Sequence, residues 1–298
     1  MLVPGPAPPF RPSYSSACMS DDGAWALARD AAELSGVAIR ELGEVTDTDR
    51  VTSIIEVVWG PQAMPTALLR AFQHAGSVFL GAFAGEEMVG FVLGFLGWKE
   101  SWHVHSHMLA VLPGWQSKGV GYALKLGQRA ACLDRGIDEV RWTYDPLVLR
   151  NARFNLVRLG AVGTAFFPGF YGEMPDRLNR GDRSDRFEVR WRLRSAVAQA
   201  RLEDRMLAIG RHGYPSILQC QGPPGASRPV ETGAWSEGGV TLTIPRDYHA
   251  LRGHDPELGA RWRVATARAF ALCFERGMVA TWIDPDGRYV FERDRGSG

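Results

Sequence analysis

Residues 109–132 read Leu-Ala-Val-Leu-Pro-Gly-Trp-Gln-Ser-Lys-Gly-Val-Gly-Tyr-Ala-Leu-Lys-Leu-Gly-Gln-Arg-Ala-Ala-Cys. An apolar strand pattern ends at Pro113-Gly114, and a turn spaced by Gly119 and Gly121 follows it. Apolar residues then recur at helical spacing, which predicts a helix. Successive main-chain N–H groups at such a helix start point at one spot, and the positive end of the helix attracts an anion. The stretch therefore predicts a strand–turn–helix unit that binds a phosphate or pyrophosphate, and it lacks the Gly-Lys-Ser/Thr of a Walker A loop.

This unit carries a family resemblance. Gln116-x-x-Gly119-x-Gly121, after a strand ending Leu109-x-Val111-x-Pro113, resembles the acyl-CoA pyrophosphate loop of the GNAT N-acetyltransferase superfamily. From residue 37 to residue 194 the expected elements follow the order β-α-α-β-β-β-α-β-α-β-β, with the last helix over 151–159, and this order is similar to that fold. The resemblance implies an α+β fold with a mixed sheet, in which the cofactor lies between the strand before the loop and the strand after its helix. In the runs Asp145-Pro146-Leu147, Phe170-Tyr171-Gly172-Glu173-Met174 and Asp185-Arg186-Phe187 the chain also resembles a GNAT subfamily of acetyltransferases with a C-terminal extension.

The chain divides into three expected parts. Residues 1–36 begin rich in proline and serine and are expected to be an N-terminal extension that is partly disordered. Residues 37–195 are the GNAT acyltransferase domain, and residues 196–298 are a smaller C-terminal α/β part without a cofactor loop. In that last part we expect a helix over 196–211, a connector over 221–237 and a long helix over about 256–276 that ends at Gly277.

The C-terminal part contains a weak echo of the first. Residues 130–136 (Ala-Ala-Cys-Leu-Asp-Arg-Gly) are similar to residues 271–277 (Ala-Leu-Cys-Phe-Glu-Arg-Gly), and each run is followed by a Trp and an Asp-Pro pair. Two interpretations stay open. The C-terminal part is a degenerate GNAT-like half, or two amphipathic helices that end in Arg-Gly are alike by chance.

Composition excludes several classes of protein. Lys plus Arg number 34 and Asp plus Glu 33, so a net charge of +1 offers no field for nucleic acid or an anionic membrane. The four cysteines show no Cys-x-x-Cys pairing, which argues against a zinc ribbon or a disulfide scaffold. No apolar run reaches the roughly 18 residues of a membrane span, and the N-terminus lacks a secretory signal pattern. We expect a cytoplasmic monomer or homodimer without nucleic-acid or membrane partners.

The resemblance implies acetyl-CoA, or another acyl-CoA such as succinyl-CoA, as co-substrate, and it implies no metal. Main-chain N–H groups of the turn would bind the pyrophosphate with added charge from Lys118, and the strand before it would pair with the pantetheine arm. The cofactor-binding residues that it implies are Leu109, Val111, Gln116, Ser117, Lys118, Gly119, Val120, Gly121, Asn151 and Asn155.

Three histidines precede the turn. His103, His105 and His107 alternate along a predicted strand, so their side chains share one face. The strand resembles that of arylalkylamine N-acetyltransferases, in which two histidines help to deprotonate the amine, and histidine titrates near neutral pH. His105 and His107 are therefore catalytic candidates. The alternatives are histidines packed or hydrogen-bonded in the sheet, and a zinc site, for which flat spacing supplies no fourth ligand.

The usual proton donor of the family is replaced. Leu156 occupies the position where a pattern similar to Asn-x-x-Ala-x-x-x-Tyr-x-Lys-x-Gly would place a tyrosine. Tyr171, flanked by glycines, and then Tyr144 are substitute candidates, with a surface aromatic as the alternative for Tyr171.

Residues 166–186 form a long connection, which suggests a function. In it Arg186, or Arg183, would hold the carboxylate of an amino-acid acceptor bidentately, and Glu173 is the second substrate-binding candidate. The alternative is that these are solvated loop charges.

The expected function is an acyl-CoA-dependent N-acyltransferase that transfers the acyl group directly to the amine of a small molecule or amino acid. Succinyl-CoA would make it an amino-acid N-succinyltransferase. An alternative of a different class is a catalytically silent CoA-binding regulatory module. It is motivated by Leu156 at the tyrosine position and by the lack of a cofactor loop in the C-terminal part. A peptide or protein acceptor is a further possibility.

Overall fold

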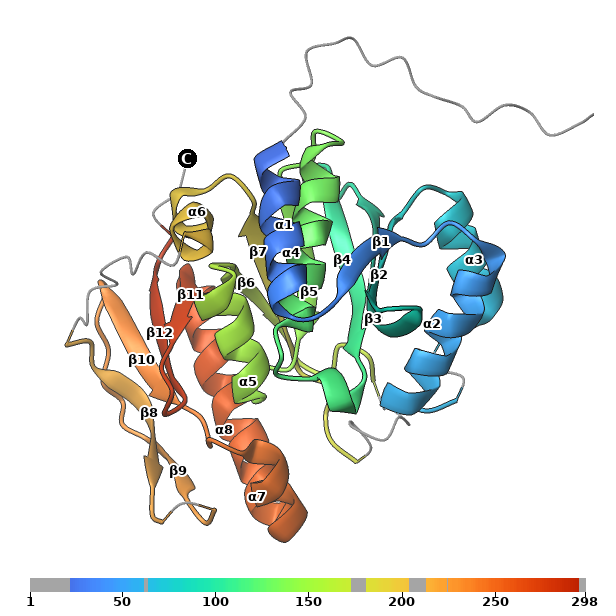
Figure 1. The fold of residues 1–298 in the computed structure, drawn as a ribbon. Helices are drawn as coiled ribbons and strands as arrows, with labels where there is room; N and C mark the ends of the chain where they lie inside the picture. The colour runs from blue at the N-terminus through green and yellow to red at the C-terminus, as the bar shows by residue number, and fades with distance from the viewer. Residues whose placement is uncertain (1–21, 62–63, 173–180, 204–212, 224, 295–298) are drawn as a thin grey trace, which may run out of the picture.

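The computed structural model describes residues 22–61, 64–172, 181–203, 213–223 and 225–294. These residues form one mixed 12-stranded sheet with helices packed on it (Figure 1). The α+β class predicted from the sequence is confirmed. The strand order is β1-β2-β3-β4-β5-β7-β6-β11-β12-β10-β8-β9.

The first half of the sheet follows the expected order of elements. Its strands are β1 (Ala38–Glu41), β2 (Val78–Ala84), β3 (Glu87–Gly97), β4 (His103–Val111), β5 (Glu139–Tyr144), β6 (Val162–Phe167) and β7 (Arg186–Arg192). Its helices are α1 (Asp22–Leu34), α2 (Val45–Val58), α3 (Thr66–His74), the 3₁₀ turn η1 (Pro113–Trp115), α4 (Val120–Leu133), α5 (Leu149–Ala152) and the π-helical segment η2 (Arg153–Arg158).

Two faces of this half are covered by different helices. On one face α1 and α4 pack together, and α1 buries Ala24, Ala28 and Ala32 (Figure 1). On the other face α2 and α3 bury apolar side chains such as Ile55 and Leu69 against β2, β3 and β4. Strands β2 and β3 therefore contribute alternate residues to two separate cores, as period-two strands buried on both faces must.

Strand β4 changes register at a bulge. Met108 pairs with Leu93 and Ser106 with Gly94, so His107 is the extra residue. A bulge of this kind locally disrupts the ladder and re-aims the side chains around it. Ser106 faces α4, whereas Met108 packs on the α2 side.

The second half adds β8 (Ser216–Gln221), β9 (Arg228–Glu231), β10 (Gly239–Thr243), β11 (Met278–Ile283) and β12 (Arg288–Arg293). Its helices are α6 (Ala196–Leu202), α7 (Tyr248–His254) and α8 (Pro256–Glu275). The halves join where Gly163 of β6 pairs with Ala280 of β11. Strand β12 lies between β10 and β11 and pairs antiparallel with both, so the strand order differs from that around β4 and β5.

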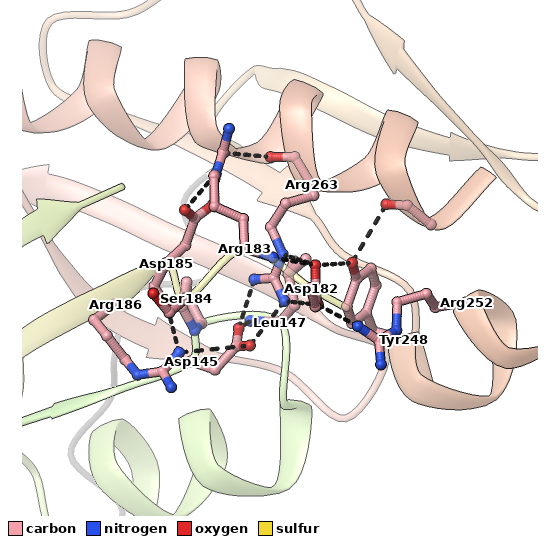
Figure 2. A network of polar contacts seen from close by, with 12 residues as sticks. Asp145, Leu147, Asp182, Arg183, Ser184, Asp185, Arg186, Tyr248, Arg252 and Arg263 are labelled. Atoms are coloured by element: carbon pink, nitrogen blue, oxygen red, sulfur yellow. Dashed lines mark hydrogen bonds and ion pairs between the residues drawn. The ribbon is translucent and has the colours of Figure 1, made fainter. Parts of the chain in front are cut away.

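An ion network ties α8 to the first half. Figure 2 shows Arg263 of α8 between Asp145 and Asp182. Its Nη1 and Nη2 donate to the two carboxylate oxygens of Asp145 at 2.9 and 2.8 Å, and its Nε donates to Asp182 Oδ1 at 3.2 Å. The Tyr248 hydroxyl donates to Asp182 at 3.2 Å. Buried charges paired in this way hold the two halves in one register.

Three expectations about elements are corrected. The connector expected over 221–237 contains strand β9, and the preceding strand β8 was not predicted. The helix expected over 151–159 is α-helical only to Ala152 and then π-helical. The helix expected over 196–211 covers Ala196–Leu202, and residues 204–212 lie outside the described ranges. Residues 1–21 also lie outside them, so the order of the N-terminal extension stays a prediction.

Candidate functional site

The turn between β4 and α4 presents free main-chain donors. Ser117 has a φ of +63° and Gly119 a φ of +93°, so the backbone reverses twice before the helix begins at Val120. Within the described part of the chain, the N–H groups of residues 117–121 have no hydrogen-bond acceptor. Residues 116–119 are exposed. Converging N–H groups at a helix start are the donor set that a phosphate requires.

Side chains around the turn hold its shape. Gln116 Nε2 donates to the carbonyl oxygen of Val111 at 3.1 Å, and Arg150 Nη1 donates to Gln116 Oε1 at 3.3 Å. The ammonium of Lys118 lies 5.0 Å from the centroid of the Trp115 ring. These contacts link the turn to the end of β4 and the start of α5, so Gln116 supports the turn through its side chain.

Gly119 is required by space as well as by its φ. A Cβ at this position would lie 2.5 Å from Ser35 Oγ, which follows the end of α1. At Gly121 a Cβ would make only ordinary contacts, 3.6 Å from Leu109 and 3.9 Å from Val111. Close packing of the turn therefore depends on Gly119, whereas Gly121 lies over the apolar end of β4.

Strands β4 and β5 part beside this turn. They run parallel and pair only at Val104–Val140 and His105–Arg141. Beyond that point β5 remains paired with β7 and β4 with β3. The β5-facing edge of β4 at Leu109 and Val111 is thus unpaired by β5 within the described residues. A pantetheine arm carries amides that fit such a strand edge, so the residues present fit an acyl-CoA.

The histidines gather on the α2 side of the sheet. The ring centroids of His105 and His107 are 6.1 Å apart, and they lie 5.2 and 5.8 Å from the ring of Phe95. His103 is buried and its Nδ1 lies 2.9 Å from the carbonyl oxygen of Ser101. Burial, and then the nearby positive charges of His107, His103 and Lys125, lower the pKa of His105 to about 4. Burial also lowers the pKa of His107. Both rings are therefore neutral at pH 7, and burial makes each a weaker base than a free imidazole.

Residues 20–154 match the family model described as the Acetyltransferase (GNAT) family. This part of the chain is a GNAT acetyltransferase domain. The match begins within the part of the chain expected to be an extension and includes α1, the turn and β5. The boundaries of the three expected parts stay predictions.

Several solved structures are similar to the GNAT domain. Naa50 of Arabidopsis thaliana, in complex with a bisubstrate analogue, is 18% identical, with 52% of this chain and 97% of that chain covered and a TM-score of 0.44. The Escherichia coli ribosomal-protein-S18-alanine N-acetyltransferase is 16% identical, with 60% and 99% covered and a TM-score of 0.43. Ard1 of Thermoplasma volcanium is 20% identical, with 52% and 96% covered and a TM-score of 0.41. A search of curated proteins found no match.

The helix after β5 departs from a continuous α-helix where the GNAT resemblance implies cofactor contacts. Asn151 is exposed near the turn, whereas Asn155 is 3% exposed within the π-helical segment. Leu156 is 1% exposed and part of the core, so the leucine at the tyrosine position of the family pattern packs as an apolar residue. π-Helical turns often mark functional sites.

Tyr171 lies on the face that carries the histidines. Its hydroxyl is 3.2 Å from Thr143 Oγ1 on β5, and its side chain is 45% exposed. Thr143 pairs with Glu188 of β7, so their side chains share this face, and His105 pairs with Arg141 two residues before Thr143. Thr143 and Glu188 were not predicted from the sequence. Their period-two positions could have placed them once the pairing of β5 with β7 was known.

The remaining sequence candidates lie in different surroundings. Tyr144 is buried, its hydroxyl is 3.3 Å from that of Tyr289, and burial raises its pKa. Arg186 is buried and its guanidinium lies 5.3 Å from the Tyr171 ring centroid. Arg183 already binds both carboxylate oxygens of Asp185, at 2.6 and 2.7 Å (Figure 2). Glu173 lies outside the described residues.

Two kinds of feature are absent from the described residues. Among these residues, no group of three or more His, Cys, Asp and Glu side chains is arranged to hold a metal ion. No helix in the described ranges combines the length and apolar character needed to cross a membrane.

Proposed function

We propose that the chain is an acyl-CoA-dependent N-acyltransferase, with acetyl-CoA as donor and the amine of a small molecule or amino acid as acceptor. When bound, the thioester supplies an activated acyl group. A cytoplasmic location is part of the same proposal.

The observation that supports this most is the free donor array of residues 117–121. Exposed N–H groups of a tight turn can simply bind water, so the features that accompany these donors carry the argument. Here they coincide with a φ-positive Gly119, a lysine at residue 118 and the parting of β4 and β5. Together these features accommodate a diphosphate followed by an extended amide-containing arm.

The acceptor would bind on the histidine face. The neutral ring of His105 can accept a hydrogen bond from the acceptor's amine there, directly or through water, and so guide the amine proton towards solvent. His107 extends this face. The Glu188 carboxylate attracts a cationic amine, and the Tyr171 hydroxyl can position it beside Thr143. An acceptor carboxylate would pair with the guanidinium of Arg186, which lies 5.3 Å from the centroid of the Tyr171 ring. This arrangement favours a small amine or amino acid.

A thiol-release assay with acetyl-CoA and succinyl-CoA tests the proposal against a panel of amines, D- and L-amino acids and peptides with free N-termini. We expect release with acetyl-CoA and at least one small amine or amino acid. His105→Asn should lower kcat at least about 100-fold, with unchanged calorimetric affinity for CoA. Release only with peptides would reject the proposed acceptor class. Binding of CoA without release across the whole panel would favour the silent module.

A further inference from the structure

Lys125 on α4 is a buried cation without a buried anion. Its side chain is 3% exposed, and its Nζ donates to Ser106 Oγ at 2.8 Å and to Gln128 Oε1 at 3.0 Å. The same Nζ lies 3.8 Å from the centroid of the Trp142 ring. No carboxylate within the described ranges forms an ion pair with it. A charged ammonium in such surroundings is costly unless an anion reaches it.

The amine lies where β4 and β5 part. The last register pair of the two strands joins His105 to Arg141. The next residue on β4 is Ser106 and the next on β5 is Trp142, and these are the two strand residues that Nζ contacts. Lys125 therefore contacts, on each of the two strands, the first residue that no longer pairs with the other strand, on the face opposite to the histidines.

The same helix links this amine to the anion turn. Helix α4 begins at Val120, so Lys125 is roughly 8 Å further along its axis. Strand β4 from Val111 back to Ser106 spans about 16 Å, the scale of an extended pantetheine arm. A ligand held by its diphosphate at the turn and by its amides along β4 would direct its sulfur toward Ser106.

We propose that Lys125 stabilises and protonates the thiolate that leaves in the acyl transfer, an inference that rests on the proposed function. The amine nitrogen forms a bond to the carbonyl carbon, and the carbon–sulfur bond breaks with its electron pair on sulfur. The Lys125 ammonium gives one proton to that sulfur and becomes neutral. It regains a proton from solvent, which has received the one that the acceptor amine lost through the histidine face.

The surroundings of Lys125 suit a proton donor. Burial lowers its pKa to about 7, against a smaller opposite effect of the Cys132 thiol. The titratable groups that face it are Cys132 on its own helix and His105 across the sheet. An acid whose pKa is near the working pH both holds and releases its proton readily. With Leu156 packed in the core, Lys125 occupies a role that the usual tyrosine does not fill here.

The test compares calorimetric affinities for CoA and desulfo-CoA, which lacks only the sulfur. We expect wild-type protein to bind CoA about 10- to 100-fold more tightly, because the thiolate pairs with the ammonium in a buried site. Lys125→Met should abolish this preference. Lys118→Met, the matched control at the turn, should weaken both ligands equally and keep the preference.

An unchanged ratio in Lys125→Met, or equal affinities in the wild-type protein, would overturn the role of Lys125 and leave the proposed function standing. Failure of both ligands to bind wild-type protein would overturn both. Circular dichroism and thermal melting establish that the variant is folded. Lys125→Gln is the second neutral variant, and Lys125→Arg, which keeps the cation, should retain part of the preference.

Discussion

In each half of the sheet a long helix leads into a strand. The two halves differ in how that strand pairs with its neighbour. Helix α4 leads into β5, which pairs with β4 at two positions only. Helix α8 leads into β11, which runs in the same direction as β10, but β12 lies between them and pairs with both along their length. Among the described residues, β10 and β11 are therefore joined through β12, whereas β4 and β5 part beside the start of α4.

The two helix starts differ in the same sense. At α4 the N-cap is Gly119, without a side-chain hydrogen bond. At α8 the N-cap is Asp255, whose carboxylate accepts from Leu258 N, and Pro256 has no N–H to satisfy. Free N–H groups at a helix start thus lie beside the parting of β4 and β5 in the first half. A site for an anion with an extended arm requires both features.

The largest predicted effect on the free energy of unfolding is at Arg263, whose guanidinium donates to two carboxylates of the protein. Arg263→Met should lower the free energy of unfolding by about 3 kcal/mol, because the carboxylates of Asp145 and Asp182 lose their main cation in a poorly solvated setting. Urea titration measures this loss in the free energy of unfolding. Arg268→Met, which removes an exposed pair 3.8 Å from Glu231, should cost less than about 1 kcal/mol. Equal losses in the two variants would show that the network does not join the halves.

The next effect concerns His105 and pH. Its folded pKa of about 4 lies below the ordinary 6.5, so the unfolded chain binds the proton first as pH falls. The stability that a neutral His105 allows is complete above pH 6.5 and is lost between 6.5 and about 4, on the order of 2 kcal/mol. His105→Asn should flatten the pH dependence of unfolding in this window, and His74→Asn, at an exposed residue of α3, should not. A slope unchanged by His105→Asn would contradict the burial of its ring.

The smallest effect concerns the start of α8. Asp255→Ala should lower the free energy of unfolding by about 1 kcal/mol, since the N–H of Leu258 loses its acceptor. Glu257→Ala, in the same turn but exposed and without a capping bond, should cost about 0.3 kcal/mol through the helix dipole. If both changes cost the same, α8 does not begin with a side-chain cap and the contrast with α4 weakens.

Local patterns predicted much of the first half. The turn at 116–121, the apolar stripe of α4 and the alternation of His103, His105 and His107 are readable because each is a short-range signal. The GNAT fold followed from their order. The C-terminal helix and its stop at Gly277 were predicted for the same reason.

Features that depend on pairing between distant strands were not predicted. The bulge at His107 appears only when β4 is set against β3, and the position of β12 only when β10 and β11 are placed. Strand β9 is short and begins Arg228-Pro229, which reads as a loop. Lys125 was not singled out because a lysine within an amphipathic helix ordinarily points to solvent. Its burial is set by Ser106 and Trp142, which come from two other strands.

Calorimetric titration of acetyl-CoA into wild-type protein, Gly119→Ala and Gly85→Ala tests the central claim most directly. Both glycines have positive φ, but a Cβ at Gly85 meets nothing within 4 Å, whereas one at Gly119 approaches Ser35. We predict saturable binding to wild-type protein, the same affinity for Gly85→Ala, and at least about tenfold weaker binding for Gly119→Ala, because the distorted turn no longer aims its N–H groups at the diphosphate. The absence of binding to wild-type protein, or equal affinities for all three, would contradict the assignment of this turn as the acyl-CoA site.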